Sequence, residues 1–255
     1  DIPLLVEELP VVKVRSRLAD DSDSNEFLEA LDELLFKLLE KGDQVKGIGI
    51  STPGIVDYHG KQLLTVAKHL KALKEKTWID YLEQRFHSSV IVINDAEAAS
   101  IGAASLGYLK GNTIFGVMPV GTGLGFSVLR NGRRWTPNYS LNLLGSIYTP
   151  DGYYDFLASA SELSKHEKQG NLENIFIQSE YKGIRERYIK HLSGIVSAAH
   201  VIYGVNKVLI GGGLAEVVSG IGFPLGDLIM DELKRESLLT SPQVEVQVLR
   251  SEEHT

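Results

Sequence analysis

Cysteine is absent from the 255 residues of the sequence. Its absence excludes disulfide frameworks, thiolate zinc sites and cysteine nucleophiles. A chain without disulfides fits a reducing compartment, and Asp1 is followed by scattered acids rather than by the basic segment and apolar block of a signal peptide. We therefore expect a cytoplasmic protein.

Dense basic segments are also missing. The 26 Lys and Arg residues are outnumbered by 33 Asp and Glu residues, which gives a formal net charge of −7 at pH 7. Proteins that bind nucleic acid usually gather basic groups against the phosphate backbone. We therefore do not expect this segment to bind nucleic acid.

An apolar run long enough for a membrane helix is lacking too. The longest uncharged stretch lies between Lys110 and Arg130, and its length alone would be sufficient. However, it contains five glycines and a proline, so it predicts a strand, a turn and a second strand. No membrane partner is expected, and the 43% hydrophobic content supports a substantial globular core.

Short apolar runs alternate with helical patterns along the chain. Strands are predicted at residues 45–50, 90–93, 113–120, 126–130 and 206–210, with one or two more within residues 3–18. Helices are predicted at residues 27–39, 78–86 and about 183–203, and from residue 96 onward. The alternation of strands and helices indicates an α/β fold in which several strands end at glycine-rich turns.

The stretch VIVINDAEAAS, residues 90–100, places Asn94 and Asp95 where a buried strand gives way to a helix. A carboxylate at the carboxyl end of a strand in an α/β protein reaches the region where ligands usually bind, so Asp95 has access to a substrate hydroxyl. The alternative is that Asp95 or Asn94 only caps the helix beginning at Ala96.

Two glycine-rich stretches are candidates for phosphate binding. In VGTGLG, residues 120–125, alternate glycines let the backbone approach an anion, and the Thr122 hydroxyl can bond a phosphate oxygen. In VLIGGGLAE, residues 208–216, three glycines precede a helix, so backbone amides face its N-terminal end. Each stretch is explained equally well as a tight turn with close packing. We call residues 121–125 the first glycine turn and residues 211–213 the second glycine turn.

Four segments follow one another in the order GIGISTPGIVD, VIVINDAEAASIGAASLG, GTGLGFSVLRNGR and VNKVLIGGGLA. In this order they resemble the ROK family, whose members are bacterial sugar kinases, sugar-responsive repressors and relatives of unassigned role. The resemblance covers roughly residues 47–215. It implies a two-lobed, ribonuclease H-like α/β fold, as in sugar kinases, actin and Hsp70 ATPases, with a ligand cleft between the lobes. We expect an N-terminal lobe over residues 1–107, lacking its first phosphate-binding hairpin, and a C-terminal lobe over residues 108–255.

The resemblance also implies roles for individual residues. Asp95 matches the acid that removes a proton from the attacking sugar hydroxyl, and Asn94 matches a neighbouring sugar contact. Pro53 and Gly54 match the bend that borders the sugar pocket, and His69 stands where the family has an asparagine. The predicted nucleotide-binding residues are Gly121, Thr122, Gly123, Gly125, Gly211, Gly212 and Gly213.

The sequence departs from the family pattern in further places. No Asp-x-Gly-Gly-Thr turn, which holds phosphate and magnesium in family kinases, occurs in it. In place of the family's Glu-x-Gly-His element, Leu143 stands at the glutamate position, Gly145 is kept and Ser146 replaces the histidine. The cysteine-rich zinc loop is replaced by Asp151 and the pair Tyr153-Tyr154, which either pack or stack on a different ligand. We therefore predict no zinc and no metal ligands from the protein.

These features leave more than one function open. The resemblance implies ATP-dependent phosphoryl transfer to a sugar hydroxyl, with Asp95 as base and with ATP and Mg²⁺ as cofactors, as in glucokinases and N-acetylhexosamine kinases. The alternative is a non-catalytic, sugar-sensing transcriptional regulator or a degenerate ligand-binding member of the family. Nothing before the first motif resembles the winged helix-turn-helix of the family's repressors, so a DNA-binding part would lie before Asp1. A homodimer is implied by the resemblance.

Overall fold

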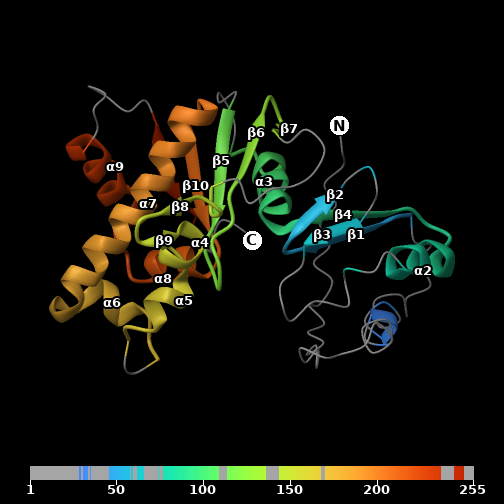
Figure 1. Ribbon diagram of the computed structural model, residues 1–255, viewed down its shortest axis with the longest axis horizontal. Coiled ribbons are helices and arrows are strands. Elements are labelled where there is room, and N and C mark those ends of the chain that lie inside the picture. Colours follow the sequence, from blue (N-terminus) through green and yellow to red (C-terminus); the bar gives the residue numbers. More distant parts are fainter. Residues whose placement is uncertain are drawn as a thin grey trace. The chain divides into compact units, whose positions relative to one another are not determined.

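The computed structural model describes residues 29, 31–33, 35, 46–57, 59, 62–65, 74, 77–108, 114–135, 144–167, 170–236 and 244–249 (Figure 1). The internal contacts of the chain separate two units, Asp1–Ile93 and Asn94–Thr255. The strands expected within residues 3–18 lie outside the described residues, as does most of the helix expected at 27–39. The predicted lobe boundary after residue 107 stays a prediction.

The first unit contains short strands and helix α2. Its elements are β1 (Ile48–Thr52), β2 (Ile55–Asp57), β3 (Gln62–Thr65), α2 (Thr77–Phe86) and most of β4 (Val90–Asn94). Strand β1 is bonded to β4, and β2 pairs with β3 in the antiparallel direction. Buried side chains of α2 and β4, among them Trp78, Leu82 and Val90, form one core with Val56 and Leu63. The predicted helix at 78–86 and the strand at 90–93 are confirmed.

A five-stranded sheet forms the centre of the second unit. Its strands are β5 (Ile114–Pro119), β6 (Ser127–Arg130), β7 (Arg133–Arg134), β10 (Lys207–Gly211) and β11 (Glu245–Val248), in the order β11-β10-β5-β6-β7. Strands β5, β10 and β11 are parallel, whereas β6 and β7 are antiparallel to their neighbours. Asn131 and Gly132 join β6 to β7 with φ angles of 52° and 72°. Two positive φ angles are typical of the hairpin turn that this dipeptide predicts.

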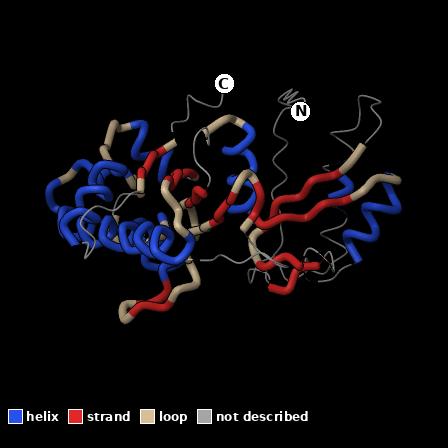
Figure 2. Tube along the Cα trace, turned by 90° about the horizontal axis from the view of Figure 1, so that it is seen from above, coloured by secondary structure: helices blue, strands red, loops and turns tan. Residues whose placement is uncertain are grey.

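Helices cover both faces of this sheet (Figures 1 and 2). Helix α3 (Asp95–Ser105) packs on β5 and β6, and its Ala103 shares a small core with Phe115, Val117, Leu129 and Leu209. Helices α7 (Lys182–Tyr203) and α9 (Leu225–Glu236) pack against each other in the larger core on the opposite face. Helix α3 is rich in alanine and other small residues, so it can approach the strands closely.

Shorter elements complete the second unit. They are β8 (Tyr148–Thr149), β9 (Gly152–Tyr153), α4 (Tyr154–Leu157), α5 (Ala160–Ser164), α6 (Glu173–Ile177), the 3₁₀ helix η2 (Ser179–Tyr181) and α8 (Gly213–Gly220). None of the described helices is by itself long and apolar enough to cross a membrane. Helices α8 and α9 would meet the requirement only together, and they are bent by 102° at the break between them.

Candidate functional site

The junction between β4 and α3 has the geometry of a capped helix start. Asn94 is buried and extended, with φ −67° and ψ 147°, and its side-chain oxygen accepts a hydrogen bond from the Ala96 amide at 3.0 Å. The Asp95 Oδ1 atom accepts from the same amide at 2.9 Å. The capping interpretation is therefore correct for Asn94, and the helix begins at Asp95 rather than at Ala96.

The Asp95 carboxyl group has a pKa above its ordinary value. Partial removal from water is the largest cause, and the negative charge of Asp155 raises the pKa further, against the lowering effect of the Ala96 amide. A carboxylate with a raised pKa is a better proton acceptor than an ordinary aspartate near neutral pH. Although its carboxyl group is partly removed from water, the residue as a whole is exposed, so a substrate hydroxyl can reach it.

The first glycine turn is held in a defined shape by its own backbone. The Gly121 amide donates to the Gly123 carbonyl at 2.9 Å, and the Gly125 amide donates to the Pro119 carbonyl at 2.9 Å. Leu124 is 1% exposed and belongs to the larger core, whereas Thr122 and Gly123 are exposed. The turn is thus anchored in the core at one residue while its tip faces solvent.

The structure brings this turn against the start of α3. A Cβ atom added at Gly125 would lie 2.9 Å from the Ala96 Cβ atom and 3.0 Å from the Pro119 Cγ atom. Real Cβ atoms do not approach that closely, so only glycine fits at this position without a shift. Gly125 therefore contacts the residue that follows Asp95.

The second glycine turn meets the first at Val120. Gly212 has φ +80°, and a Cβ atom there would lie 2.7 Å from the Val120 carbonyl oxygen. The Val120 amide donates to the Gly211 carbonyl at 2.9 Å, and the Leu214 amide donates to the Val120 carbonyl at 3.1 Å. Both glycine turns and Asp95 therefore belong to one contiguous region of the second unit.

Asp155 is an acid of this region that sequence analysis missed. Its Oδ1 atom accepts a hydrogen bond from the Leu124 amide at 2.6 Å, and a Cβ atom at Gly123 would lie 2.8 Å from the same oxygen. Its charge also contributes to the raised pKa of Asp95. The sequence offers one weak signal, since Asp155 directly follows the tyrosine pair that replaces the zinc loop.

Two amides at the tip of the first glycine turn are available to a ligand. Within the described part of the chain, the N–H groups of Thr122 and Gly123 donate to no protein acceptor. Adjacent exposed amides in a glycine turn are suited to the oxygens of a phosphate group.

The other predicted residues belong to other parts of the chain. Pro53 and Gly54 join β1 to β2 in the first unit, where Gly54 has φ 107°, and their part in a sugar pocket stays a prediction. His69 lies outside the described residues, as does Leu143. Ser146 is exposed in the loop before β8.

The tyrosine pair has two different environments. The ring of Tyr153 stacks edge to face on exposed Tyr148 and on Phe156, with centroids 5.1 and 6.3 Å apart. Tyr154 instead packs against the larger core, close to Gly194 of α7. Packing is therefore the role of Tyr154, and stacking between aromatic rings is the observed role of Tyr153.

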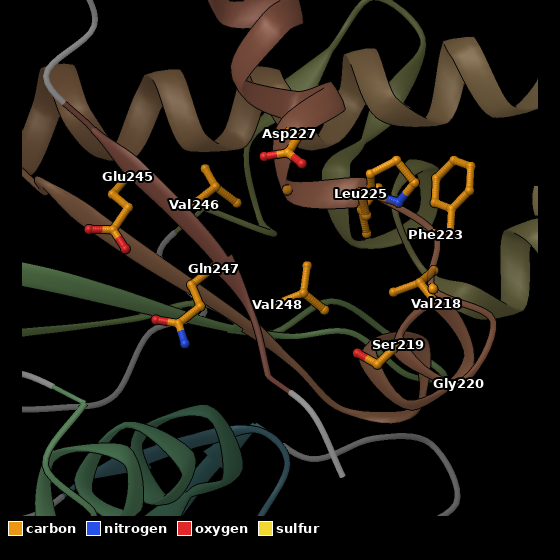
Figure 3. Close-up of a pocket in the computed structure, with 13 residues that line it drawn as sticks. Val218, Ser219, Gly220, Phe223, Leu225, Asp227, Glu245, Val246, Gln247 and Val248 are labelled. Atoms are coloured by element: carbon orange, nitrogen blue, oxygen red, sulfur yellow. The ribbon is translucent and has the colours of Figure 1, made fainter. Parts of the chain in front are cut away.

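A separate groove of about 700 Å³ lies beside the sheet edge at β11 (Figure 3). It is lined by Val246 and Val248 of β11, by Phe223 of the α8–α9 connection and by Leu225 at the start of α9, with Asp227 and Glu245 also present. None of the predicted site residues lines this groove.

Among the described residues, no group of three or more His, Asp or Glu side chains is arranged to hold a metal ion. A metal that binds mainly through the oxygens of its nucleotide does not need such a group. The Asp155 carboxylate is bonded to the first glycine turn, and its charge acts on the Asp95 carboxyl group.

Comparison with known proteins identifies the family. The sequence profile described as the ROK family matches residues 4–139, slightly more than half of the chain. The chain therefore belongs to the ROK family. No curated protein sequence matches it.

Solved structures show the same fold at low sequence identity. The ROK hexokinase of Thermus thermophilus is 18% identical with a TM-score of 0.68, and the match covers 90% of this chain and 82% of the hexokinase. A ROK family glucokinase from Streptomyces griseus, in complex with glucose and AMPPNP, is 18% identical with a TM-score of 0.69, over 91% of this chain and 85% of the glucokinase.

A ROK family transcriptional regulator, a homologue of the E. coli MLC protein, is similar to the same degree. It is 17% identical with a TM-score of 0.70, and the match covers 88% of this chain but only 64% of the regulator. The predicted fold of sugar kinases, actin and Hsp70 ATPases is confirmed by these likenesses. Kinases and a regulator therefore share the fold of this chain.

Proposed function

We propose that the protein is an ATP-dependent kinase that transfers the γ-phosphoryl group to a sugar hydroxyl. The observation that carries the proposal is the contact between Gly125 and Ala96, which joins the first glycine turn to the helix that begins at Asp95. A phosphate on the exposed tip of the turn and a hydroxyl at Asp95 would then occupy neighbouring positions. Membership of the ROK family and the likeness to a glucokinase with bound glucose and AMPPNP support the choice of sugar and ATP.

The reaction needs one proton acceptor and several donors to phosphate. The Asp95 carboxylate accepts the proton of the sugar hydroxyl while the hydroxyl oxygen forms a bond to the γ-phosphorus. The bond between the γ-phosphorus and the β,γ-bridging oxygen breaks, which releases ADP. The Thr122 and Gly123 amides donate to the phosphate oxygens, where charge is concentrated. Positioning and electrostatic stabilisation of this kind provide most of the catalysis in phosphoryl transfer.

Magnesium would enter as the nucleotide complex. Mg²⁺ usually keeps several waters and binds through one or two carboxylates together with substrate phosphates. The Asp155 carboxylate, which is bonded to the first glycine turn, fits this partial role. The ion would neutralise part of the phosphate charge.

The proposal is tested by ATP consumption over a panel of hexoses and N-acetylhexosamines. We expect sugar-dependent ADP release by the wild type and a loss of about 10²–10⁴-fold in Asp95→Asn, which keeps the shape but removes the base. Asp227→Asn, an exposed acid on α9, is the matched control and should keep full activity. Equal ATP consumption by the wild type and Asp95→Asn would show that Asp95 is not the base.

A sugar-sensing regulator is the second candidate. It is favoured by the likeness to a ROK regulator and by Ser146, which stands where the family has a histidine. A regulator would bind a sugar, as measured by calorimetry, without consuming ATP in its presence. Sugar-dependent ADP release that is lost in Asp95→Asn would exclude this candidate.

A further inference from the structure

The first glycine turn is held from one side by residues 155–161, which we call the supporting segment. This segment runs from α4 into α5 and makes three hydrogen bonds to the backbone of the turn. The Ala160 amide donates to the Gly121 carbonyl at 2.9 Å, and the Ser161 hydroxyl donates to the Thr122 carbonyl at 2.5 Å. Asp155 accepts from the Leu124 amide at 2.6 Å.

These bonds fix the orientation of two peptide planes. A trans peptide is planar, and its carbonyl and N–H group point in opposite directions. Because the Gly121 carbonyl points toward Ala160, the Thr122 N–H must point away from the supporting segment. Because the Thr122 carbonyl points toward Ser161, the Gly123 N–H must point away as well. The segment thus directs both exposed amides to the same side of the turn.

The third bond removes a competing donor. Asp155 holds the Leu124 amide on the side of the supporting segment, so this amide is not offered to a ligand. Of the three consecutive N–H groups, those of Thr122 and Gly123 therefore face away from the supporting segment, and that of Leu124 is bonded to the Asp155 carboxylate. Ala160 acts through its backbone, whereas Asp155 and Ser161 act through side chains that can be changed.

We infer that Ser161 and Asp155 are positioning residues that aim the Thr122 and Gly123 amides at phosphate. This inference rests on the proposed function, because it names how the turn is made ready for nucleotide. Without the Ser161 hydroxyl, the peptide between Thr122 and Gly123 can rotate, since glycine tolerates both orientations. The Gly123 amide would then be withdrawn from the ligand.

Nucleotide binding is the first test, with Mg²⁺ and the non-hydrolysable analogue AMPPNP as the probe in calorimetry. Loss of one hydrogen bond to a charged group should weaken binding about tenfold or more in Ser161→Ala. Ser161→Thr restores a hydroxyl and should bind within about twofold of the wild type. Ser164→Ala is the matched control, because this exposed serine lies on the same helix and its hydroxyl donates to the Ala160 carbonyl rather than to the first glycine turn. Urea unfolding of each variant checks that the fold is kept.

Amide hydrogen exchange of the ligand-free protein is the second test, and it does not depend on the proposed function. The Leu124 amide should exchange at least about tenfold faster in Asp155→Ala than in the wild type, and Ser164→Ala should not change it. Binding by Ser161→Ala within twofold of the wild type would overturn the aiming role of Ser161. Unchanged Leu124 exchange in Asp155→Ala would overturn the role of Asp155. If the wild type does not bind AMPPNP, the proposed function fails, and the exchange result alone decides whether the supporting segment holds the turn.

Discussion

Replacement of Gly212 by alanine should destabilise the protein severely, although it adds only one methyl group. The backbone of Gly212, with φ +80° and ψ −175°, lies in a region open almost only to glycine, and an alanine there costs about 1–3 kcal/mol. The new Cβ atom would also lie 2.7 Å from the Val120 carbonyl oxygen and 2.9 Å from its nitrogen. Backbone atoms cannot move aside as a flexible side chain does, so overpacking adds about 1–3 kcal/mol.

The expected loss is therefore about 2–6 kcal/mol of unfolding free energy, out of a typical total of about 5–15 kcal/mol. Urea unfolding at equilibrium, followed by circular dichroism, measures it as a shift in midpoint. Gly213→Ala is the matched control at the next position, where nothing lies within 4 Å of an added Cβ atom. That variant should be unchanged or more stable by up to about 1 kcal/mol. Equal midpoints for the two variants would refute the close approach between the two glycine turns.

Three further changes have defined outcomes. The pKa of Asp95 is raised in the folded state, so the folded protein holds this proton more tightly than the unfolded chain does. The wild type should therefore lose stability relative to Asp95→Asn as the pH rises from about 4, where an unfolded aspartate titrates, to the higher pKa of the folded state. Identical stability profiles from pH 3 to 7 would contradict this. Glu97→Gln should cost about 1–2 kcal/mol in urea unfolding, since Glu97 is 2% exposed and its carboxylate lies 3.6 Å from the Arg134 guanidinium; a cost that persists in Arg134→Gln would show that the pair is not its source. Leu192→Ala should cost about 2–5 kcal/mol of unfolding free energy, because Leu192 is fully buried in the larger core. A loss below about 1 kcal/mol in urea unfolding would show that α7 does not pack in this core as described.

Local sequence signals were sufficient for the elements that surround the site. The apolar run before Asn94 predicts β4, and the small residues after it predict α3, because period and capping preference act over a few residues. The strands on either side of the first glycine turn and the Asn131-Gly132 hairpin were predictable for the same reason. Whether Asn94 or Asp95 caps the helix was not predictable, since both side chains are suitable and packing decides between them.

The supporting segment could not be predicted from the sequence. Asp155 and Leu124 are 31 positions apart, and their bond depends on how α4 is placed against the sheet. Strands β8 and β9 have two residues each, which is too short for any period to be visible. The closeness of Gly212 to Val120 likewise results from parallel pairing of β10 with β5, which brings together residues far apart in the chain.

The burial of Leu124 has a consequence for the thermodynamics of ligand binding. A loop that becomes ordered when a ligand binds loses conformational entropy, and this loss lowers the affinity. The first glycine turn is already anchored in the larger core by Leu124, so it has little conformational freedom left to lose on binding. Binding of a phosphate compound should therefore cost little backbone entropy. Substitutions of core residues that pack against Leu124, although these residues touch no ligand atom, should weaken the affinity.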